Sequence, residues 1–480
     1  MKELQKVINR IIERVNVNLR ELDIDVNSYI GEIIPLNQLV KFYGFYGITP
    51  HHPLDFDFRY SNLAGSCFLG KCSVNNSVIY KSDIRGDELK KRGEYFEYNG
   101  YKIPINDDEI IKIIDSLLVK TLVHNYSHDP ENLEEFLIKN SISLHYANIH
   151  GSKIEGCFVL PFSTIDLTTG HDCIIGAFSY IQAEEIEHLD IKDGTVWVRN
   201  KDDFNFFYRF NEGILKKYIN FEPNKRPQGI FMDFVEERKL DFEHIYDKVK
   251  SKTDINIPYG ASIDRYALVK GNTRISENVL VAQRAYIQDS IMGKGANAQE
   301  HCYIINSCLE GYNVTAHGGK VINSMLGQKV FVGFNSFLRG KPDAVLTIGE
   351  ESIVMPHTII DLEEKVDIPK RHIVWGYIKN QKDIESNSAS IDNFLKIKEG
   401  AIYGNLIFKG NGEYFVRAFQ NRIEHILEAN GAYFDGNRNR GHAQNNQNIS
   451  FNIIQPYPEG ELEGLYPTIN IKPLMPIQNN

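Results

Sequence analysis

The stretch IPYGASIDRYALVKGNTRISENVLVAQRAYIQDS, residues 257–290, decides the fold of this chain. An aliphatic residue stands at every sixth position of it, and the residues between are mostly polar or small. A helix repeats after about 3.6 residues and a strand after about 2.0, so neither keeps one kind of side chain at every sixth place. A coil of three short strands does. The stride therefore predicts a parallel β-helix of triangular section, with about 18 residues per coil and the aliphatic side chains stacked inside.

The six-residue stride continues beyond this stretch and defines where the β-helix lies. Its positions are Ile257, Ile263, Val269, Ile275, Val281 and Ile287, then after five-residue steps Met292, Ala298, Ile304, Leu309, Thr315, Val321, Leu326, Val332 and Leu338, and after an insertion Ile348, Val354, Ile360 and Val366. The segment IGAFSYI at 175–181 follows the same pattern. We therefore predict a main β-helix over 253–375 and an earlier block over 142–198.

The segments outside these blocks are expected to be helical or extended. Apolar residues at helical spacing predict helices near residues 4–15, 107–141, 229–249, 391–398 and 416–430. The predicted organisation adds an N-terminal helical region over 1–141, which could include a first coil near 66–84, an inserted aromatic and helical subdomain over 199–252, and a C-terminal helical extension with a Pro-rich arm over 376–480. We expect the arm to pack on the prism or on a neighbouring subunit.

Composition narrows the class of protein. The chain has 480 residues, 42% of them hydrophobic and 24% charged, and a net charge of −10, as in soluble globular proteins. An acidic balance without a basic block argues against nucleic acid as a partner. The six cysteines form no CxxC pair, which fits a reducing cytoplasm, and no apolar run reaches the roughly 18 residues of a membrane span. We expect a cytoplasmic protein that binds neither nucleic acid nor a membrane.

Counting along the coils places a set of polar residues on one edge of the prism. The fourth residue of successive units on the second side is Tyr266, Arg284, His301, Gly318, Asn335 and His357, with His317 one place before this row. Equivalent residues of neighbouring coils lie about 4.8 Å apart, so these side chains should climb one edge together. They could simply face solvent. Three of the 15 histidines cluster there, however, which favours a binding or catalytic role.

Three short segments of the repeat are similar to those of a known protein family. ISENV at 275–279, VGFNS at 332–336 and IGEES at 348–352 resemble the hexapeptide-repeat, left-handed β-helix superfamily. We therefore predict a mainly β chain, a left-handed parallel β-helix of hexapeptide repeats with helical insertions and a C-terminal helical extension. The resemblance also implies a homotrimer that transfers an acyl group from a thioester of CoA or acyl carrier protein to a small-molecule amine or hydroxyl, at clefts between subunits.

Acyl transfer of this kind needs a general base and a group that receives the developing oxyanion. His317 is the first candidate for the base, because Gly318 and Gly319 after it could open the backbone to the oxyanion. The glycine pair could equally be a turn of the coil. His301 is the second candidate for a catalytic role.

Other members of the polar row suit substrate binding. Arg284 could hold a carboxylate or a phosphate, and we expect Asn335 and His357 to contact the substrate. No nucleophile elbow, P-loop or Gly-x-Gly-x-x-Gly follows a predicted strand, which leaves hydrolase, kinase and dinucleotide functions without support. Apart from the acyl donor, no cofactor is therefore expected.

Within the superfamily, the sequence motifs of this chain are most similar to those of the γ-class carbonic anhydrase-like branch. GANAQE at 295–300 is similar to that branch's Gly-x-Asn-x-Gln-Asp, and NVTAHG at 313–318 to its first Gly-His segment. The branch's zinc-binding histidines would fall on Ile305, His317 and Ile322. Because isoleucine supplies no ligand, we expect no metal at this position, although His301 or Cys302 could substitute in principle. The alternatives to an acyltransferase are a metal lyase or thioesterase of this branch, and a non-catalytic scaffold.

Overall fold

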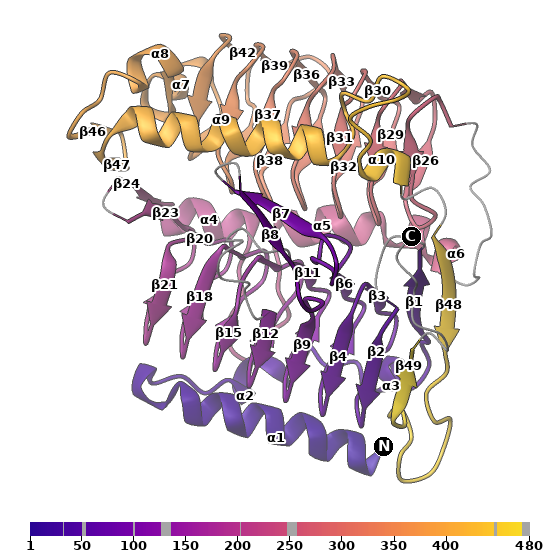
Figure 1. The fold of residues 1–480 in the computed structure, drawn as a ribbon. Coiled ribbons are helices and arrows are strands. Elements are labelled where there is room, and N and C mark those ends of the chain that lie inside the picture. Colours follow the sequence, from indigo (N-terminus) through magenta and orange to yellow (C-terminus); the bar gives the residue numbers. More distant parts are fainter. Residues whose placement is uncertain are drawn as a thin grey trace. The chain divides into compact units, whose positions relative to one another are not determined.

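The computed structural model describes residues 1–31, 33–49, 54–98, 101–125, 136–201, 203–246, 257–445 and 449–472. The chain forms two compact units. The first unit comprises Met1–Asp193, Leu215–Asp233 and Ile449–Asn480, and the second comprises Gly194–Ile214 and Phe234–Asn448. Each contains a β-helix-like stack of short parallel strands, so the predicted mainly β fold is confirmed (Figure 1).

In the first unit each coil contributes one strand to each of three parallel sheets. The first sheet contains β20 (Tyr180–Gln182), β17 (Thr164–Asp166), β14 (Asn148–His150), β11 (Leu122–His124), β6 (Asp83–Arg85), β3 (Cys67–Leu69) and β1 (Gly44–Ile48). The second contains β22 (Asp190–Ile191), β19 (Ile174–Ile175), β16 (Phe158–Val159), β13 (Ile142–Ser143), β10 (Leu117–Val119) and β5 (Val78–Tyr80). The third contains β21 (Glu184–Glu187), β18 (Thr168–His171), β15 (Ile154–Glu155), β12 (Phe136–Lys139), β9 (Ile111–Ile114), β4 (Cys72–Asn75) and β2 (Phe56–Arg59).

Short helices and a hairpin complete the first unit. The predicted N-terminal helix is confirmed as α1 (Lys2–Asn18), which buries the apolar stripe Leu4, Val7, Ile8, Ile11, Ile12 and Val15 and runs along the coils (Figure 1). The other elements of this part of the chain are η1 (Arg20–Leu22), α2 (Asn27–Ile30), α3 (Leu36–Leu39), the hairpin β7 (Tyr95–Tyr98) and β8 (Tyr101–Pro104), and α4 (Glu212–Tyr218). No helix among the described residues is long and apolar enough to cross a membrane.

The expectation of a helical region over 107–141 is wrong where the structure describes it. Residues 111–124 form β9, β10 and β11, and the coils begin well before residue 142. The buried side chains here, Ile113, Leu118 and Val123, follow a stride of five. Asp115 and Lys120 adopt positive φ at the corners between these strands (47° and 50°), and the steps of five residues depart from the six-residue stride. Residues 126–135 lie outside the described part, and 136–139 form β12.

The Pro-rich arm packs on the first unit. Its strand β48 (Ser450–Ile454) pairs antiparallel with β1, and β49 (Ile469–Ile471) pairs antiparallel with β2. Two of the three sheets of this unit therefore end in a strand that comes from the far end of the sequence. The arm thus finds its partner surface within the same chain.

The second unit repeats the three-sheet plan. Its first sheet contains β25 (Ser262–Ile263), β28 (Leu280–Val281), β31 (Asn297–Ala298), β34 (Val314–Thr315), β37 (Phe331–Val332), β40 (Ile353–Val354), β43 (His372–Val374) and β45 (Ser388–Ser390). Its second contains β26 (Leu268–Lys270), β29 (Tyr286–Gln288), β32 (Tyr303–Ile305), β35 (Lys320–Ile322), β38 (Phe337–Arg339), β41 (Ile359–Asp361) and β44 (Tyr377–Ile378). Its third contains β27 (Arg274–Ile275), β30 (Ile291–Met292), β33 (Cys308–Leu309), β36 (Ser324–Leu326), β39 (Leu346–Ile348) and β42 (Val366–Ile368). Most of the predicted stride positions form its core.

Helices and an antiparallel ribbon flank these coils. The expected helices near 229–249, 391–398 and 416–430 are found as α5 (Ile230–Glu237), α6 (Lys239–Tyr246), α8 (Ile391–Phe394) and α9 (Gly412–Ala429), joined by α7 (Gln381–Asn387) and α10 (His442–Asn445). The ribbon contains β23 (Thr195–Asn200), β24 (Phe204–Arg209), β47 (Leu406–Gly410) and β46 (Gly400–Tyr403). Phe204 and Phe206 of the ribbon pack on Phe415 of α9, each with ring centroids 5.2 Å apart.

Candidate functional site

The predicted polar row of the second unit occupies successive corners between its first two sheets. Arg284, His301, Asn335 and His357 all adopt positive φ, between 50° and 60°. The backbone N–H of each corner donates to the preceding coil, for example from Asn335 to the carbonyl of His317 at 3.0 Å. The row is therefore one edge of the prism, as counting predicted. The solvent-facing alternative is wrong for its buried members, since Asn335 and His357 are 2% and 0% exposed.

His317 forms the most suggestive contact on this edge. Its Nδ1 lies 2.9 Å from Oε2 of Glu300, and the two side chains are 2% and 6% exposed. Because Ala298 pairs with Thr315 in the first sheet, these residues hold the same place in neighbouring coils. The ring of His317 also packs against Phe334 at a centroid distance of 5.3 Å. A carboxylate in this place can orient the imidazole and stabilise its charged form.

The glycine pair after His317 is a turn of the coil. Gly318 adopts a φ of 73°, and a side chain there would meet Oδ1 of Asn335. Its N–H donates to the carbonyl of Glu300 at 2.9 Å, and the N–H of Gly319 donates to Ala316 at 2.9 Å. Both donors are used inside the coil. The hypothesis that this pair offers backbone donors to an oxyanion is therefore wrong.

Lys320, which the sequence did not single out, follows Gly319 directly and is the first residue of β35. Its Nζ donates to the carbonyl of Gly318 at 2.6 Å, and the residue is 3% exposed. Burial lowers the pKa of this amine to about 8. The thiol of Cys302, a substitute metal ligand in principle, contacts the carbonyl oxygens of Thr315 and Ala316, and burial raises its pKa to about 12.

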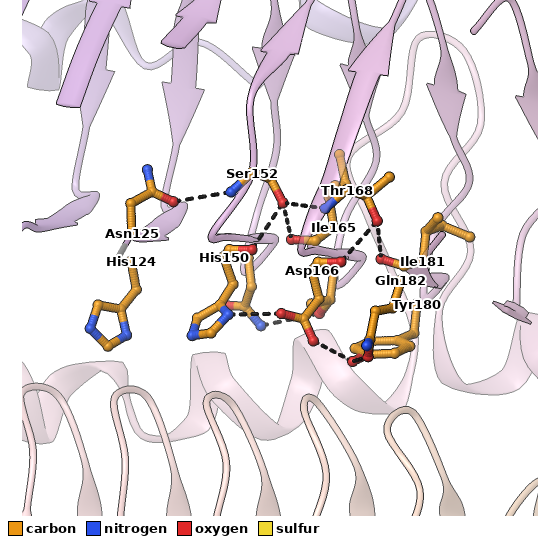
Figure 2. Close-up of polar contacts among 12 residues, drawn as sticks. His124, Asn125, His150, Ser152, Ile165, Asp166, Thr168, Tyr180, Ile181 and Gln182 are labelled. Carbon is orange, nitrogen blue, oxygen red and sulfur yellow. Dashed lines mark hydrogen bonds and ion pairs between the residues drawn. The ribbon is translucent and has the colours of Figure 1, made fainter. Parts of the chain in front are cut away.

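The first unit carries a second polar row, which sequence reasoning missed. The pairing of neighbouring strands places Arg85, His124, His150 and Asp166 directly beside one another in the first sheet. All four are buried, with exposed fractions from 0% to 7%. Figure 2 shows the side chains of the last three projecting to the same side of the sheet. A row of ionisable groups on the outer face of a prism is unusual, because buried charges are costly unless they are paired.

Asp166 pairs with the histidine of the neighbouring coil. Its Oδ1 lies 2.8 Å from Nδ1 of His150, and its Oδ2 accepts a hydrogen bond from the hydroxyl of Tyr180 (Figure 2). The same hydroxyl lies 3.0 Å from Oε1 of Gln182. The carboxylate is thus held from two sides, and the imidazole is oriented by it.

A second carboxylate cluster lies at the His124 end of the row. Arg85 donates two hydrogen bonds to Asp87, from Nε to Oδ1 at 3.0 Å and from a terminal nitrogen to Oδ2 at 2.5 Å. Nε2 of His124 lies 3.8 Å from Oε2 of Glu88 and 4.0 Å from Oδ1 of Asp87. The rings of His124 and His150 meet edge to face, with centroids 5.3 Å apart.

The zinc position of the carbonic anhydrase-like branch keeps only one of that branch's three ligands in this chain. Ile305 and Ile322 pair across β32 and β35 and are 5% and 7% exposed. Aliphatic side chains carry no donor atom, so His317 alone remains of the branch's three ligands.

Comparisons with known proteins agree with this architecture. Residues 101–223 match a family model described as a hexapeptide repeat including a loop. The crystal structure of a protein described as a "putative acetyltransferase", from Desulfovibrio desulfuricans G20, shares 49% identity over 98% of this chain and 99% of that chain, with a TM-score of 0.92. A hexapeptide transferase family protein from Anaplasma phagocytophilum shares 18% identity over 37% of this chain and 97% of that one, but its TM-score of 0.21 supports no argument. No curated protein matches the sequence.

Proposed function

Because the chain belongs to the hexapeptide-repeat transferase family, with an acetyltransferase-like relative along its whole length, we propose that it transfers an acyl group. The donor is the thioester of CoA or of an acyl carrier protein, and the acceptor is a small-molecule amine or hydroxyl. The observation that carries this proposal is the buried contact between His317 and Glu300 at 2.9 Å. A histidine oriented by a carboxylate is a common general base.

The proposed reaction balances without a further reactant. With Glu300 beside Nδ1, Nε2 of His317 takes the proton from the acceptor while the acceptor's nitrogen or oxygen attacks the thioester carbonyl. The tetrahedral adduct then collapses, the carbon–sulfur bond breaks, and the imidazolium returns the proton to the departing thiolate. Glu300 stabilises the imidazolium in between.

The other corner residues are assigned to substrate binding. Half-buried Arg284 suits a carboxylate or a phosphate of donor or acceptor. His357 and the side-chain amide of Asn335 supply polar groups on the same edge, and the amide of Asn335 is our candidate for the oxyanion, since the glycine donors are used. His301 is assigned to substrate contact or to an auxiliary catalytic role. We further propose left-handed coils and a homotrimer, which the family resemblance supports, and a cytoplasmic location, which the absence of CxxC pairs among the six cysteines supports.

A donor-binding and turnover experiment tests the proposal. We expect acetyl-CoA to raise the melting temperature of the purified protein, and release of the CoA thiol to report turnover with a panel of amines and hydroxyl compounds. His317→Ala should lower turnover by about 10²- to 10⁴-fold and leave the thermal shift with acetyl-CoA intact. Glu300→Gln should lower kcat by at least about tenfold without changing KM. Arg284→Ala should chiefly weaken the thermal shift.

Matched controls come from the same unit. His372→Ala removes a partly exposed imidazole outside the row, and Glu350→Gln neutralises an exposed carboxylate paired with Lys370. Both should behave as the wild type. Turnover by His317→Ala at the wild-type rate, or equal thermal shifts in the wild type and Arg284→Ala, would remove this edge as the site.

A further inference from the structure

Two imidazoles of the first unit lie at the distance from which one metal ion can join them. His124 and His150 stand side by side on β11 and β14, and both are buried, with 7% and 5% exposed. One ring nitrogen of each lies within 4.8 Å of one ring nitrogen of the other. Nitrogens bound to one tetrahedral zinc are roughly 3.4 Å apart, since each zinc–nitrogen bond is about 2.0 Å. A small rotation of either ring is therefore enough.

His150 contacts a carboxylate, as metal-binding histidines typically do. Asp166 accepts at Nδ1 of His150, 2.8 Å away, so Nδ1 carries the proton and Nε2 keeps its lone pair. A ligand histidine typically donates its other ring N–H to a carboxylate in this way, and the carboxylate fixes the ring and makes it a better ligand. The hydroxyl of Tyr180 holds Asp166 in turn.

A carboxylate lies beside His124. Oε2 of Glu88 is 3.8 Å from Nε2 of His124 and belongs to a side chain that is 21% exposed. The neighbouring Asp87 is at 4.0 Å, but both of its oxygens accept from Arg85. Glu88 is therefore the carboxylate better placed to turn toward an ion.

We propose that His124, His150 and Glu88 bind one divalent transition metal ion of the zinc class. Two nitrogen ligands and one oxygen ligand suit Zn²⁺, Co²⁺ or Ni²⁺ better than Mg²⁺ or Ca²⁺, which prefer oxygen alone. Three protein ligands leave a fourth position for water or a substrate oxygen. The proposal does not depend on acyl transfer by His317, and its ligands are not those of the carbonic anhydrase-like position.

Metal content and Co²⁺ spectra of the full-length protein test this site. After loading with Zn²⁺ and dialysis, we expect about one zinc ion per chain by elemental analysis. Chelated protein titrated with Co²⁺ should develop the visible absorption of a four-coordinate ion. His124→Gln and His150→Gln should each reduce retained zinc at least tenfold. Asp166→Asn, which keeps the shape of the side chain, should weaken binding about 10- to 100-fold, and Glu88→Gln should weaken it as well.

The control is a surface histidine of the same unit that also lies near carboxylates. His188 has Asp172 at 3.9 Å and Glu187 at 3.5 Å, and its side chain is half exposed, so His188→Gln should retain the wild-type zinc content. Circular dichroism and melting curves show whether each variant folds, and Asp166→Asn carries the test if a histidine variant does not. Zinc-loaded wild type that loses all its metal on dialysis, or folded variants that retain as much as wild type, would overturn the proposal.

Discussion

Lys320 is a buried amine whose charge destabilises the second unit. At neutral pH both folded and unfolded chains protonate it, but burial lowers its pKa in the fold to about 8, so the folded state is penalised by up to about 3 kcal/mol. We expect Lys320→Met to raise the free energy of unfolding at pH 7 by about 1–3 kcal/mol, with the lost hydrogen bond to Gly318 reducing the gain. Urea denaturation at pH 7 measures it.

The pH dependence of the free energy of unfolding, compared between the wild type and Lys320→Met, tests the same assignment. Between about pH 8 and 10.5, the ordinary pKa of a lysine, the unfolded chain still holds the proton that the folded chain has released. Stability contributed by this residue therefore rises with pH across that window in the wild type. In Lys320→Met this rise should be missing, so the difference between the two proteins should shrink toward pH 10. A constant difference from pH 7 to pH 10 would contradict the assignment.

How much of the site the sequence predicts depends on the regularity of the coil. In the second unit, counting brings His317 to the right edge, and Glu300 stands one coil of 17 residues earlier, so their contact could also have been found. His150 and Asp166 are 16 residues apart, a coil length that the six-residue stride does not contain. His124 is harder to place, because a ten-residue segment outside the described part precedes the next strand.

At the scale of strands, the six-residue stride predicts the second unit well and the first only in part. Every predicted stride position from Ile263 to Val366 lies in a β-strand of the second unit. The first unit contains consecutive five-residue steps, as from Val74 to Ile79 and on to Ile84, whereas the second unit has single five-residue steps between six-residue ones. The corners at Asn76 and Lys81 use one residue fewer than the corners of a six-residue step. The physical reason for the error is therefore corner length, which hydrophobic periodicity does not report.

The pairing of the arm with β1 and β2 predicts a local loss of protection when the arm is removed. Deleting residues 449–480 removes β48 and β49 and leaves two sheet edges unpaired. We expect amide hydrogens of β1 and β2 to exchange at least about tenfold faster, because their hydrogen bonds lose partners. Hydrogen exchange followed by mass spectrometry measures this for each peptide.

A shorter deletion provides the comparison for the arm. Removing only residues 473–480 keeps both strands, and exchange in β1 and β2 should stay at the wild-type rate. Exchange in β25 to β44 of the second unit should not change in either protein. Equal protection of β1 and β2 with and without the arm would show that the antiparallel pairs contribute little.

For the whole molecule we expect a trimer. The Pro-rich arm does not support a trimer, since it pairs with strands of its own chain. The exposed face of the third sheet of the second unit does support this expectation. Ile291 and Met325, 42% and 51% exposed, flank half-buried Cys308 on successive strands, and such an exposed apolar row is a typical contact surface. Sedimentation at micromolar concentration should give three times the chain mass of 55.0 kDa.

Charged substitutions on this row test where the contact lies. Ile291→Asp with Met325→Asp should release single chains, since a buried unpaired carboxylate is costly. Tyr414→Asp, at an apolar side chain of α9 that is 51% exposed, should leave the mass unchanged. A wild type that sediments as a single chain would refute the trimer itself.

The arm is synthesised long after the strand β1 with which it pairs. β1 leaves the ribosome roughly 400 residues before β48 is made, which at about 5–20 residues per second is roughly 20–80 s. During that interval the nascent chain presents an unpaired strand edge, the kind of edge that recruits other chains into aggregates. We therefore expect the edge of β1 to be the place where a nascent chain aggregates or binds a chaperone until its own partner strand is made.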